Sequence, residues 1–383
     1  MNPENHDQSS NPHNSTSKIK LSRNKYLAAD QSKQKKSHFG AKVTGLIALL
    51  VIGIGVAYGA GVYFNALETV QQAYHGNGTT SKRISENKPI SILLLGVDQG
   101  IEGRHDQGNS DTMILITLNP QKKKATMTSI PRDLLVDVLG DGKDGGKYYM
   151  SRINSAYEVG GYRASSKTVS KAFNVPINYY MEVNMQALES MVDAVGGVDV
   201  NVPFTFTYHT HFKKGKMHLN GKQALDYARM RKDDPRGDYG RQMRQRQIIN
   251  QIVNKGLSIN SVSNYRKILK IISKYVETNL TFNDMMTIAM NYRGVASNIE
   301  SGYVHGHDAT IGGASMQVAS TKELQRVSDL NRSNLDLPKE KLHNEETRQN
   351  RLQKGIDWKD PAEFENYIIY AQHSDTQAWD GTN

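Results

Sequence analysis

A cluster of basic residues within residues 229–252 is the part of this sequence best suited to chemistry. The bases are Arg229, Arg231, Lys232, Arg236, Arg241, Arg244 and Arg246, and the only acids among them are Asp233, Asp234 and Asp238. A guanidinium group stays protonated in proteins and can form two parallel hydrogen bonds to a phosphate. The excess of positive charge therefore indicates an anionic ligand, and a phosphate-bearing molecule is the sharpest hypothesis.

The apolar residues that follow predict that these arginines lie on a helix with one buried face. If Asp238 is the N-cap of this helix, one stripe carries Arg241, Gln245, Ile248 and Ile252, while Arg244 and Arg246 fall towards its flanks. An arginine on the buried side needs a partner, because an unpaired charge away from water is costly. The alternative is a solvated basic helix that packs on the core, which is the common meaning of a run of charge.

Length, charge and cysteine content limit the class of protein. The chain has 383 residues, enough for one large domain or two ordinary ones with an ample core. Its formal net charge of +10 favours an anionic partner, which can be nucleic acid, a membrane surface or an anionic polymer. The absence of cysteine excludes disulfides and zinc–thiolate sites.

The N-terminal part of the sequence predicts a membrane anchor. Residues 1–42 are rich in Asn, Ser, Gln and Lys and have no apolar periodicity, which is typical of a disordered tail. Residues 43–64 carry no charge and are long enough to cross a bilayer as a helix. A cleaved signal peptide is the alternative, but the long leader, the length of the apolar run and the lack of a convincing A-x-A site favour an uncleaved anchor.

Charges on the two sides of this span predict its orientation. The bases before it are Lys18, Lys20, Arg23, Lys25, Lys33, Lys35, Lys36 and Lys42, whereas the first charge after it is Glu68. The positive-inside rule therefore places the N-terminus in the cytoplasm and everything beyond Phe64 outside the cell. We expect a single-pass protein of the cell membrane whose arginine cluster does not meet nucleic acid.

Three apolar runs after the linker of residues 65–88 predict strands that end close together. The runs are residues 90–97, 112–118 and 125–130. Short connections favour antiparallel pairing, so the end of the first strand, the start of the second and the end of the third share one sheet edge. That edge carries Asp98, Asp111, Arg132 and Asp133. Two carboxylates beside a guanidinium suit Mg²⁺ and the phosphate that it neutralises, although aspartates at strand ends are also common turn formers.

Helices and strands alternate through the rest of the predicted globular part, which indicates an α/β fold. Helices are predicted at 151–161, 165–173, 185–195, 262–276 and 282–292 and from Gly221 onward, and strands at 177–183, 198–202 and 300–305. Residues 204–218 include His209 and His211, whose HxH spacing hints weakly at a metal, but a surface hairpin is the favoured interpretation. After about Ala314 the polar chain predicts a flexible tail with one short helix, in which the roles of Trp358 and Trp379 stay open.

Six ordered motifs between residues 90 and 254, behind the anchor, resemble the LytR-CpsA-Psr family. They are LLLGVD, NSDTMIL, SIPRDL, RINSAYEVGG, GGVDVNV and ALDYARMRKDDPRGDYGRQMRQRQ. The resemblance implies a three-layer α/β/α sandwich with a central mixed sheet, which we assign to residues 89–312, followed by the polar tail of residues 313–383. It also implies an enzyme that transfers an anionic glycopolymer, such as wall teichoic acid or capsule, from a polyprenyl pyrophosphate carrier to peptidoglycan, with the lipid tail in an apolar pocket.

The resemblance further implies roles for single residues. Asp98 and Asp111 match the family's Mg²⁺ ligands, Arg132 its PRD arginine, and Arg152 a basic substrate-binding residue. The pyrophosphate arginines match Arg229, Arg231 and Arg241, with Asp238 and Gln245 as supporting polar residues. Relatives commonly have arginine where this chain has Gly100 and Asn109, and Arg104 is the candidate that replaces one of these charges.

Phosphoryl-transfer chemistry then predicts a mechanism in which positioning and charge neutralisation do most of the work. The predicted catalytic residues are Asp98, Asp111, Arg132 and Arg241, and Asp98 is the first candidate for the base that helps deprotonate the attacking sugar hydroxyl. Two other functions stay open. One is a transcriptional attenuator, which requires the basic helix to lie in the cytoplasm with DNA. The other is a module that binds anionic wall polymer without catalysis.

Overall fold

The computed structural model describes residues 81–97, 109–139, 148–257, 271–272, 274–292, 294–295, 298–359 and 367–371. The predicted N-terminal tail and anchor, with most of the linker, lie outside these residues, as do Asp98, Gly100 and Arg104. None of the helices in these ranges combines the length and the hydropathy needed to cross a bilayer.

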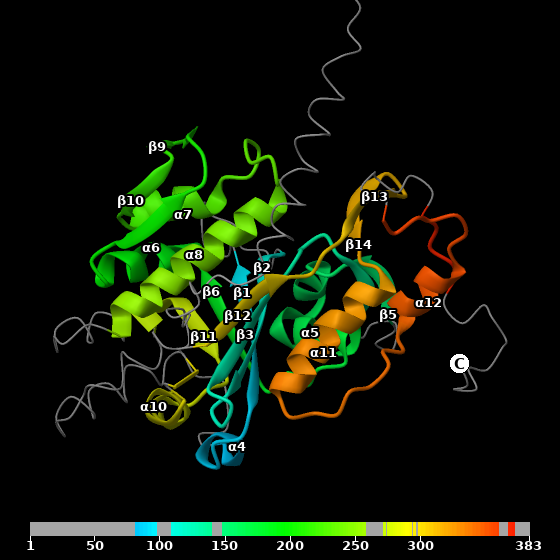
Figure 1. Ribbon diagram of the computed structural model, residues 1–383, viewed down its shortest axis with the longest axis horizontal. Coiled ribbons are helices and arrows are strands. Elements are labelled where there is room, and N and C mark those ends of the chain that lie inside the picture. Colours follow the sequence, from blue (N-terminus) through cyan, green and yellow to red (C-terminus); the bar gives the residue numbers. More distant parts are fainter. Residues whose placement is uncertain are drawn as a thin grey trace, which may run out of the picture.

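A six-stranded mixed sheet forms the centre of the described part, in the order β11-β6-β1-β2-β3-β12 (Figure 1). Its strands are β1 (Ile90–Val97), β2 (Ser110–Asn119), β3 (Lys124–Ile130), β6 (Tyr179–Asn184), β11 (Val276–Thr278) and β12 (Ile299–Tyr303). The pairs β1–β2 and β2–β3 are antiparallel, as the short connections predict, whereas β6 is parallel to β1 and β12 is parallel to β3. The prediction of a central mixed sheet is confirmed.

The register of these strands brings three strand ends to one edge. Val97, the last residue of β1, pairs with Ser110, the first residue of β2. Met113 in β2 pairs with Ile130, the last residue of β3. The parallel strands β6 and β12 also end at this edge, so loops that follow four strands and the loop that precedes β2 lie together.

Alternating side chains on the strands contact two apolar cores. Leu94 faces a core shared with α6 (Met185–Ala194), α7 (Gly221–Arg229), α8 (Asp238–Leu257) and α10 (Phe282–Asn291). Leu93 and Leu95 face a second core shared with α5 (Ser155–Phe173) and α11 (Thr321–Asn334). Helices therefore cover both faces of the sheet (Figure 1). The continuous apolar run of β1 is explained by burial on both faces.

Smaller elements surround this centre. The short helix α4 (Lys82–Ser85) precedes β1. Four two-stranded ladders lie outside the central sheet in the described residues. They pair β4 (Leu135–Leu139) with β5 (Tyr148–Arg152), β7 (Val198–Val202) with β10 (Gly215–Leu219), β8 (Phe206–Tyr208) with β9 (Thr210–Phe212), and β13 (His307–Ile311) with β14 (Ala314–Val318). The hairpin β8–β9 confirms the predicted surface hairpin. The two helices predicted around Gly160 and Gly161 lie within the range of α5, and a kink with non-helical backbone angles at these two glycines separates them.

The prediction of a largely flexible tail from residue 313 is wrong for the part that is described. β14, α11 and α12 (Glu345–Leu352) follow that point, and Leu324 and Val327 of α11 are buried in the second core. The sequence pattern hides this packing because α11 also buries amides. Asn334 donates a hydrogen bond of 2.8 Å to the hydroxyl of Thr117, and the hydroxyl of Thr126 donates one of 3.0 Å to Asn331. Because part of the buried face of α11 is polar, its apolar stripe is narrower than that of a helix packed by apolar side chains alone.

Glu182 in β6 is a buried carboxylate that links the stability of the sheet to pH. Its side chain is 7 % exposed, accepts a hydrogen bond of 3.1 Å from the Tyr157 hydroxyl and lies on the strand register opposite Glu277 of β11. Burial, and then the charge of Glu277, raises the pKa of Glu182 to about 7. Because this pKa is higher in the folded than in the unfolded chain, Glu182 stabilises the fold below about pH 4.5, and the contribution is lost as the pH rises through about 7.

We therefore expect Glu182 to lower the free energy of unfolding by up to about 3 kcal/mol between about pH 4.5 and about pH 8. Urea unfolding of the wild type and of Glu182→Gln across this range measures the effect. In the variant, the free energy of unfolding should fall much less with pH than in the wild type. Glu158→Gln, at an exposed position on α5, is the control and should keep it. An unchanged decline in Glu182→Gln would show that this carboxylate has an ordinary pKa.

Candidate active site

The sheet edge brings together the acidic and basic residues that follow its strands. Asp111 in β2 and Arg132 after β3 form an ion pair, with 2.5 Å between Nη1 of Arg132 and Oδ1 of Asp111. Nε of Arg132 and Nε of Arg152 lie 3.6 Å and 3.7 Å from the two carboxylate oxygens of Asp133. Asp98 lies outside the described residues, and β1 ends one residue before it, opposite Ser110.

The helix α8 brings Arg241 to the same edge. The predicted inward stripe is confirmed, because Arg241, Gln245, Ile248 and Ile252 are all buried. Nη2 of Arg241 lies 2.5 Å from Oδ1 of Asp238 and donates a hydrogen bond of 3.4 Å to the main-chain oxygen of Asp111. This last contact joins the helix to the sheet edge.

Asp238 is the first residue of α8, but its carboxylate binds side chains instead of capping main-chain N–H groups. One oxygen pairs with Arg241, and the other accepts a hydrogen bond of 2.7 Å from Nε2 of Gln242. The expected N-cap is therefore replaced by a contact that orients Arg241.

The positive charge at this edge is only partly compensated. Burial lowers the pKa of Arg241, and the charge of Asp238 offsets part of this effect. The positive charges of Arg132 and Arg231 lower this pKa further. Nε of Arg241 and Nε of Arg132 are buried, and neither donates a hydrogen bond within the described residues. Buried N–H groups of charged side chains are costly when they lack an acceptor. The geometry therefore suits an anion that supplies oxygen atoms to both guanidinium groups.

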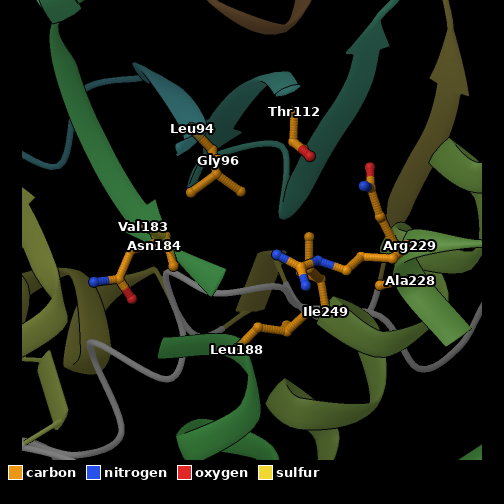
Figure 2. A pocket seen from close by; sticks show the side chains of 10 residues that line it. Leu94, Gly96, Thr112, Val183, Asn184, Leu188, Ala228, Arg229 and Ile249 are labelled. Carbon is orange, nitrogen blue, oxygen red and sulfur yellow. The ribbon is translucent and has the colours of Figure 1, made fainter. Parts of the chain in front are cut away.

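A pocket opens next to this anion site on the α8 face of the sheet. Its volume of about 540 Å³ includes its solvent-filled mouth, and its lining residues are Leu94, Gly96, Thr112, Val183, Asn184, Leu188, Ala228, Arg229, Gln245 and Ile249. Figure 2 shows the side chain of Arg229 reaching into the pocket between the sheet residues and the apolar side chains of Leu188 and Ile249. The pocket is apolar along its depth and has polar groups at a few points, which is typical of a site for an elongated amphipathic ligand.

Gly96 is required where the pocket meets the sheet. A Cβ atom at this position would lie 2.8 Å from Cβ of Thr112 on the neighbouring strand. Glycine therefore permits the close approach of β1 and β2 beside the cavity.

The two arginines at the end of α7 join the pocket to the anion site. Arg229 is the last residue of this helix and lines the pocket, and Arg231 is exposed two residues later. Arg231 is close enough to Arg241 for its charge to lower the pKa of that guanidinium. The structure therefore gathers the predicted residues Arg132, Arg229, Arg231 and Arg241 around one region, with Gln245 in the pocket wall.

Arg244 is a residue whose importance the sequence analysis missed. Instead of lying on the flank of α8, it is fully buried, and it pairs with the buried carboxylate of Asp234. Its other N–H groups donate hydrogen bonds to the main-chain oxygens of Tyr227 and Met230, and the Nε contact measures 2.9 Å. These two carbonyl groups stand on either side of Arg229, so Arg244 fixes the end of α7 that carries Arg229.

Arg246 is also buried, contrary to the predicted flank position. Its guanidinium donates a hydrogen bond of 2.7 Å to the hydroxyl of Ser129 and lies over the ring of Tyr303, 5.7 Å from its centroid. The flanks of α8 are buried because α7 and the loop after it cover one side, while β3 and β12 lie against the other. A charge pattern alone does not reveal such neighbours.

A metal ion at this edge would require ligands from more than one strand end. Among the described residues, no three His, Asp or Glu side chains converge in a metal-binding arrangement. Asp111 offers the hard carboxylate oxygens that Mg²⁺ prefers, and one of them is bound to Arg132. The HxH segment gives no such site either, since His209 contacts Asp226 and His211 contacts Thr207.

Comparison with known proteins places this site in a family. The model of the LytR_cpsA_psr family matches residues 60–333, so the chain belongs to this family. It is 44 % identical over 280 residues to a protein of Bacillus mycoides named polyisoprenyl-teichoic acid–peptidoglycan teichoic acid transferase TagU, and the match covers 70 % of this chain and 89 % of that protein.

Solved structures show the same fold. Protein gbs0355 of Streptococcus agalactiae is 39 % identical, with a TM-score of 0.64, and the match covers 69 % of this chain and 93 % of that one. A structure described as TagT bound to LIIa-WTA is 27 % identical, with a TM-score of 0.55, and the match covers 65 % of this chain and 92 % of that one. The family implied by the six sequence motifs is confirmed, and so is an α/β fold with a central mixed sheet.

The contact between Arg244 and Asp234 can be tested through a neighbouring glycine. A Cβ atom added at Gly240 in α8 would overlap the carboxylate of Asp234. We expect Gly240→Ala to displace that carboxylate, weaken its pairing with Arg244 and lower the free energy of unfolding by about 1–3 kcal/mol. Gly302→Ala is the control, because its Cβ would meet no atom within 4 Å, and it should change stability by less than about 0.5 kcal/mol. Equal stability of the two variants in urea unfolding would refute the tight contact.

Proposed function

We propose that this protein transfers a teichoic-acid-type anionic glycopolymer from a polyprenyl pyrophosphate carrier to peptidoglycan. The observation that carries the proposal is the pair of buried guanidinium Nε atoms that donate no hydrogen bond among the described residues, beside an apolar pocket that Arg229 enters. A diphosphate joined to a long apolar chain matches both features in one molecule. The names of the relatives support the same activity, since TagU is named as a teichoic acid transferase and TagT was solved with LIIa-WTA.

The proposal includes a place for the enzyme at the membrane. The uncharged run of residues 43–64 serves as a single transmembrane anchor with the N-terminus in the cytoplasm, and the domain that carries the site lies outside the cell. The domain has the three-layer α/β/α arrangement of the family. A carrier lipid embedded in the same membrane can then deliver its diphosphate to the domain.

Mg²⁺ is part of the proposal because the carboxylate of Asp111 lies at the anion site. Asp111, together with Asp98, would provide oxygen ligands for the ion. When bound, it would neutralise negative charge on the diphosphate and favour departure of the polyprenyl phosphate. Arg132 already pairs with Asp111 and so would lie beside both the ion and the phosphate.

The residues of the chain do the remaining work by binding and orientation. Arg132 and Arg241 donate to the diphosphate oxygens through their Nε groups, and Arg229 and Arg231 bind the part nearer the lipid. Arg152, Asp238 and Gln245 help to position these groups, with Arg104 as a further candidate cation. The guanidinium groups stabilise the charge that develops on the leaving polyprenyl phosphate. A sugar hydroxyl of peptidoglycan attacks the phosphorus of the glycopolymer phosphate, and Asp98 is the proposed base that takes its proton.

Substitution of Arg241 tests this role directly. Full-length protein in detergent is incubated with lipid-linked polymer, Mg²⁺ and peptidoglycan chains, and covalent polymer–peptidoglycan product is measured. We expect Arg241→Ala to lower kcat/KM by roughly 10²–10³-fold, because a cation aimed at developing charge is lost. A protein that only binds polymer would give no covalent product even as the wild type.

The matched control for this experiment is Arg163→Ala. Arg163 is an exposed arginine on α5, on the opposite face of the sheet, where it contacts Tyr162. This variant should retain wild-type turnover. Wild-type turnover by Arg241→Ala as well would remove Arg241 from the mechanism.

Substitution of Leu188 tests whether the pocket takes the lipid tail. Leu188→Trp fills space between α6 and the sheet, so it should weaken binding of farnesyl pyrophosphate by about tenfold or more, since apolar contact area is lost. Inorganic pyrophosphate lacks the tail and should bind both proteins equally in isothermal titration. Leu188→Met, which conserves volume, is the control. Unchanged farnesyl pyrophosphate binding by Leu188→Trp would place the tail elsewhere.

A further inference from the structure

The structure contains an extended peptide segment that is bound along a helix near the C-terminus. The family match ends at residue 333, but the described chain continues through α12 to residues 367–371. α12 contacts β4 and α11 at one side of the domain (Figure 1). This part of the chain therefore adds structure to the family domain.

Two glutamines bind the main chain of that segment, Gln349 in α12 and Gln353 directly after this helix. Gln353 donates a hydrogen bond of 2.8 Å to the main-chain oxygen of Ile368 and accepts one of 3.0 Å from its N–H group. Gln349 forms the same pair of bonds with Tyr370, at 2.8 Å and 2.9 Å. Each side-chain amide thus replaces the partner that a neighbouring strand would provide.

The spacing of the two partners explains why this pairing fits. Glutamines four residues apart lie on one helix face and are separated by roughly 6 Å along the axis. Alternate residues of an extended chain face the same side and are separated by roughly 6.6 Å. The spacing of the two glutamine amides therefore matches the spacing of alternate residues in an extended peptide. The helix can bind such a peptide without a neighbouring β-strand.

The side chains of the segment contribute through one anchor. Tyr367 is 5 % exposed, packs with Leu135, Ala309 and Val318, and donates a hydrogen bond of 2.8 Å to Oδ1 of Asn350. Ile368, by contrast, is 55 % exposed. The face of α12 therefore recognises main-chain geometry and one buried tyrosine.

The same face of α12 is bonded to the elements that position Arg152. Asn350 donates a hydrogen bond of 2.9 Å to the main-chain oxygen of Ala319, just after β14. Within β14, the N–H of Gln317 donates to the main-chain oxygen of Asp133 at 2.8 Å, and the main-chain oxygen of Ser315 accepts a bond of 3.0 Å from Nε of Arg152. The hairpin is therefore in contact with the bound segment on one side and with the anion site on the other.

We propose that the α12 face formed by Gln349, Asn350 and Gln353 is a docking site for an extended peptide, and that residues 367–371 of the same chain occupy it. Docking of this segment holds the hairpin β13–β14 in place. Since Ser315 of β14 accepts a hydrogen bond from Arg152, the segment thereby positions Arg152. The effect on Arg152 in the reaction rests on the proposed function, whereas the docking does not.

Amide hydrogen exchange on the full-length protein tests the docking. The amides of Ile368 and Tyr370 should be protected in the wild type. In the double variant Gln349→Leu, Gln353→Leu their exchange should become at least roughly tenfold faster, because each amide loses its acceptor. Ile368→Ala changes an exposed side chain and should leave the protection of Tyr370 unchanged. Fast exchange of both amides in the wild type, or equal protection in the double variant, would overturn the docking site.

Donor kinetics test the positioning of Arg152 with the same variants. The double variant should raise KM for the lipid-linked donor roughly tenfold with kcat largely retained, because a charge-assisted contact of Arg152 is misplaced. Arg152→Ala should raise KM similarly, and the combination should add little to it. An unchanged KM in the double variant, or fully additive effects, would overturn the positioning role. If the wild type makes no product, the proposed function fails, and hydrogen exchange still decides the docking.

Discussion

The requirement that a buried guanidinium group be fully paired explains more of this molecule than any other constraint. Arg241 and Arg244 stand one helical turn apart on α8, and both are buried. Each of the three guanidinium nitrogens of Arg244 donates a hydrogen bond inside the protein, to Asp234 and to the main-chain oxygens of Tyr227 and Met230. Arg241 pairs with Asp238 and donates a hydrogen bond to the main-chain oxygen of Asp111, but its Nε has no acceptor in the described residues. Arg244 therefore has a structural role, whereas the described residues leave an N–H group of Arg241 available to an anion.

The fold supplies the conditions for this contrast. Antiparallel pairing of the first three strands puts Asp111 and Arg132 at one sheet edge, and the parallel strands on either side end there too. The first turn of α8 contacts that edge, so a single helix contributes Arg241 to the anion site and Gln245 and Ile249 to the pocket. The clustered guanidinium groups and the apolar pocket then follow from one packing arrangement.

Sequence analysis predicted the structural features that depend on local sequence pattern and on short connections between strands. The antiparallel strands, the inward stripe of α8 and the contact between Asp111 and Arg132 belong to this group. The burial of Arg244 and Arg246 was beyond prediction, because it depends on α7, β3 and β12, which come from distant parts of the chain. The packing of the C-terminal helices was missed for another reason. Their buried Asn and Gln side chains look polar in sequence and are satisfied only by tertiary hydrogen bonds.

A structure of the domain with bound farnesyl pyrophosphate tests the central claim most directly. The account predicts that the phosphate oxygens accept hydrogen bonds from Nε of Arg132 and Nε of Arg241, with the isoprenoid chain along Leu94, Leu188 and Ile249. A diphosphate bound away from these two atoms, or an isoprenoid chain outside the pocket, would contradict it.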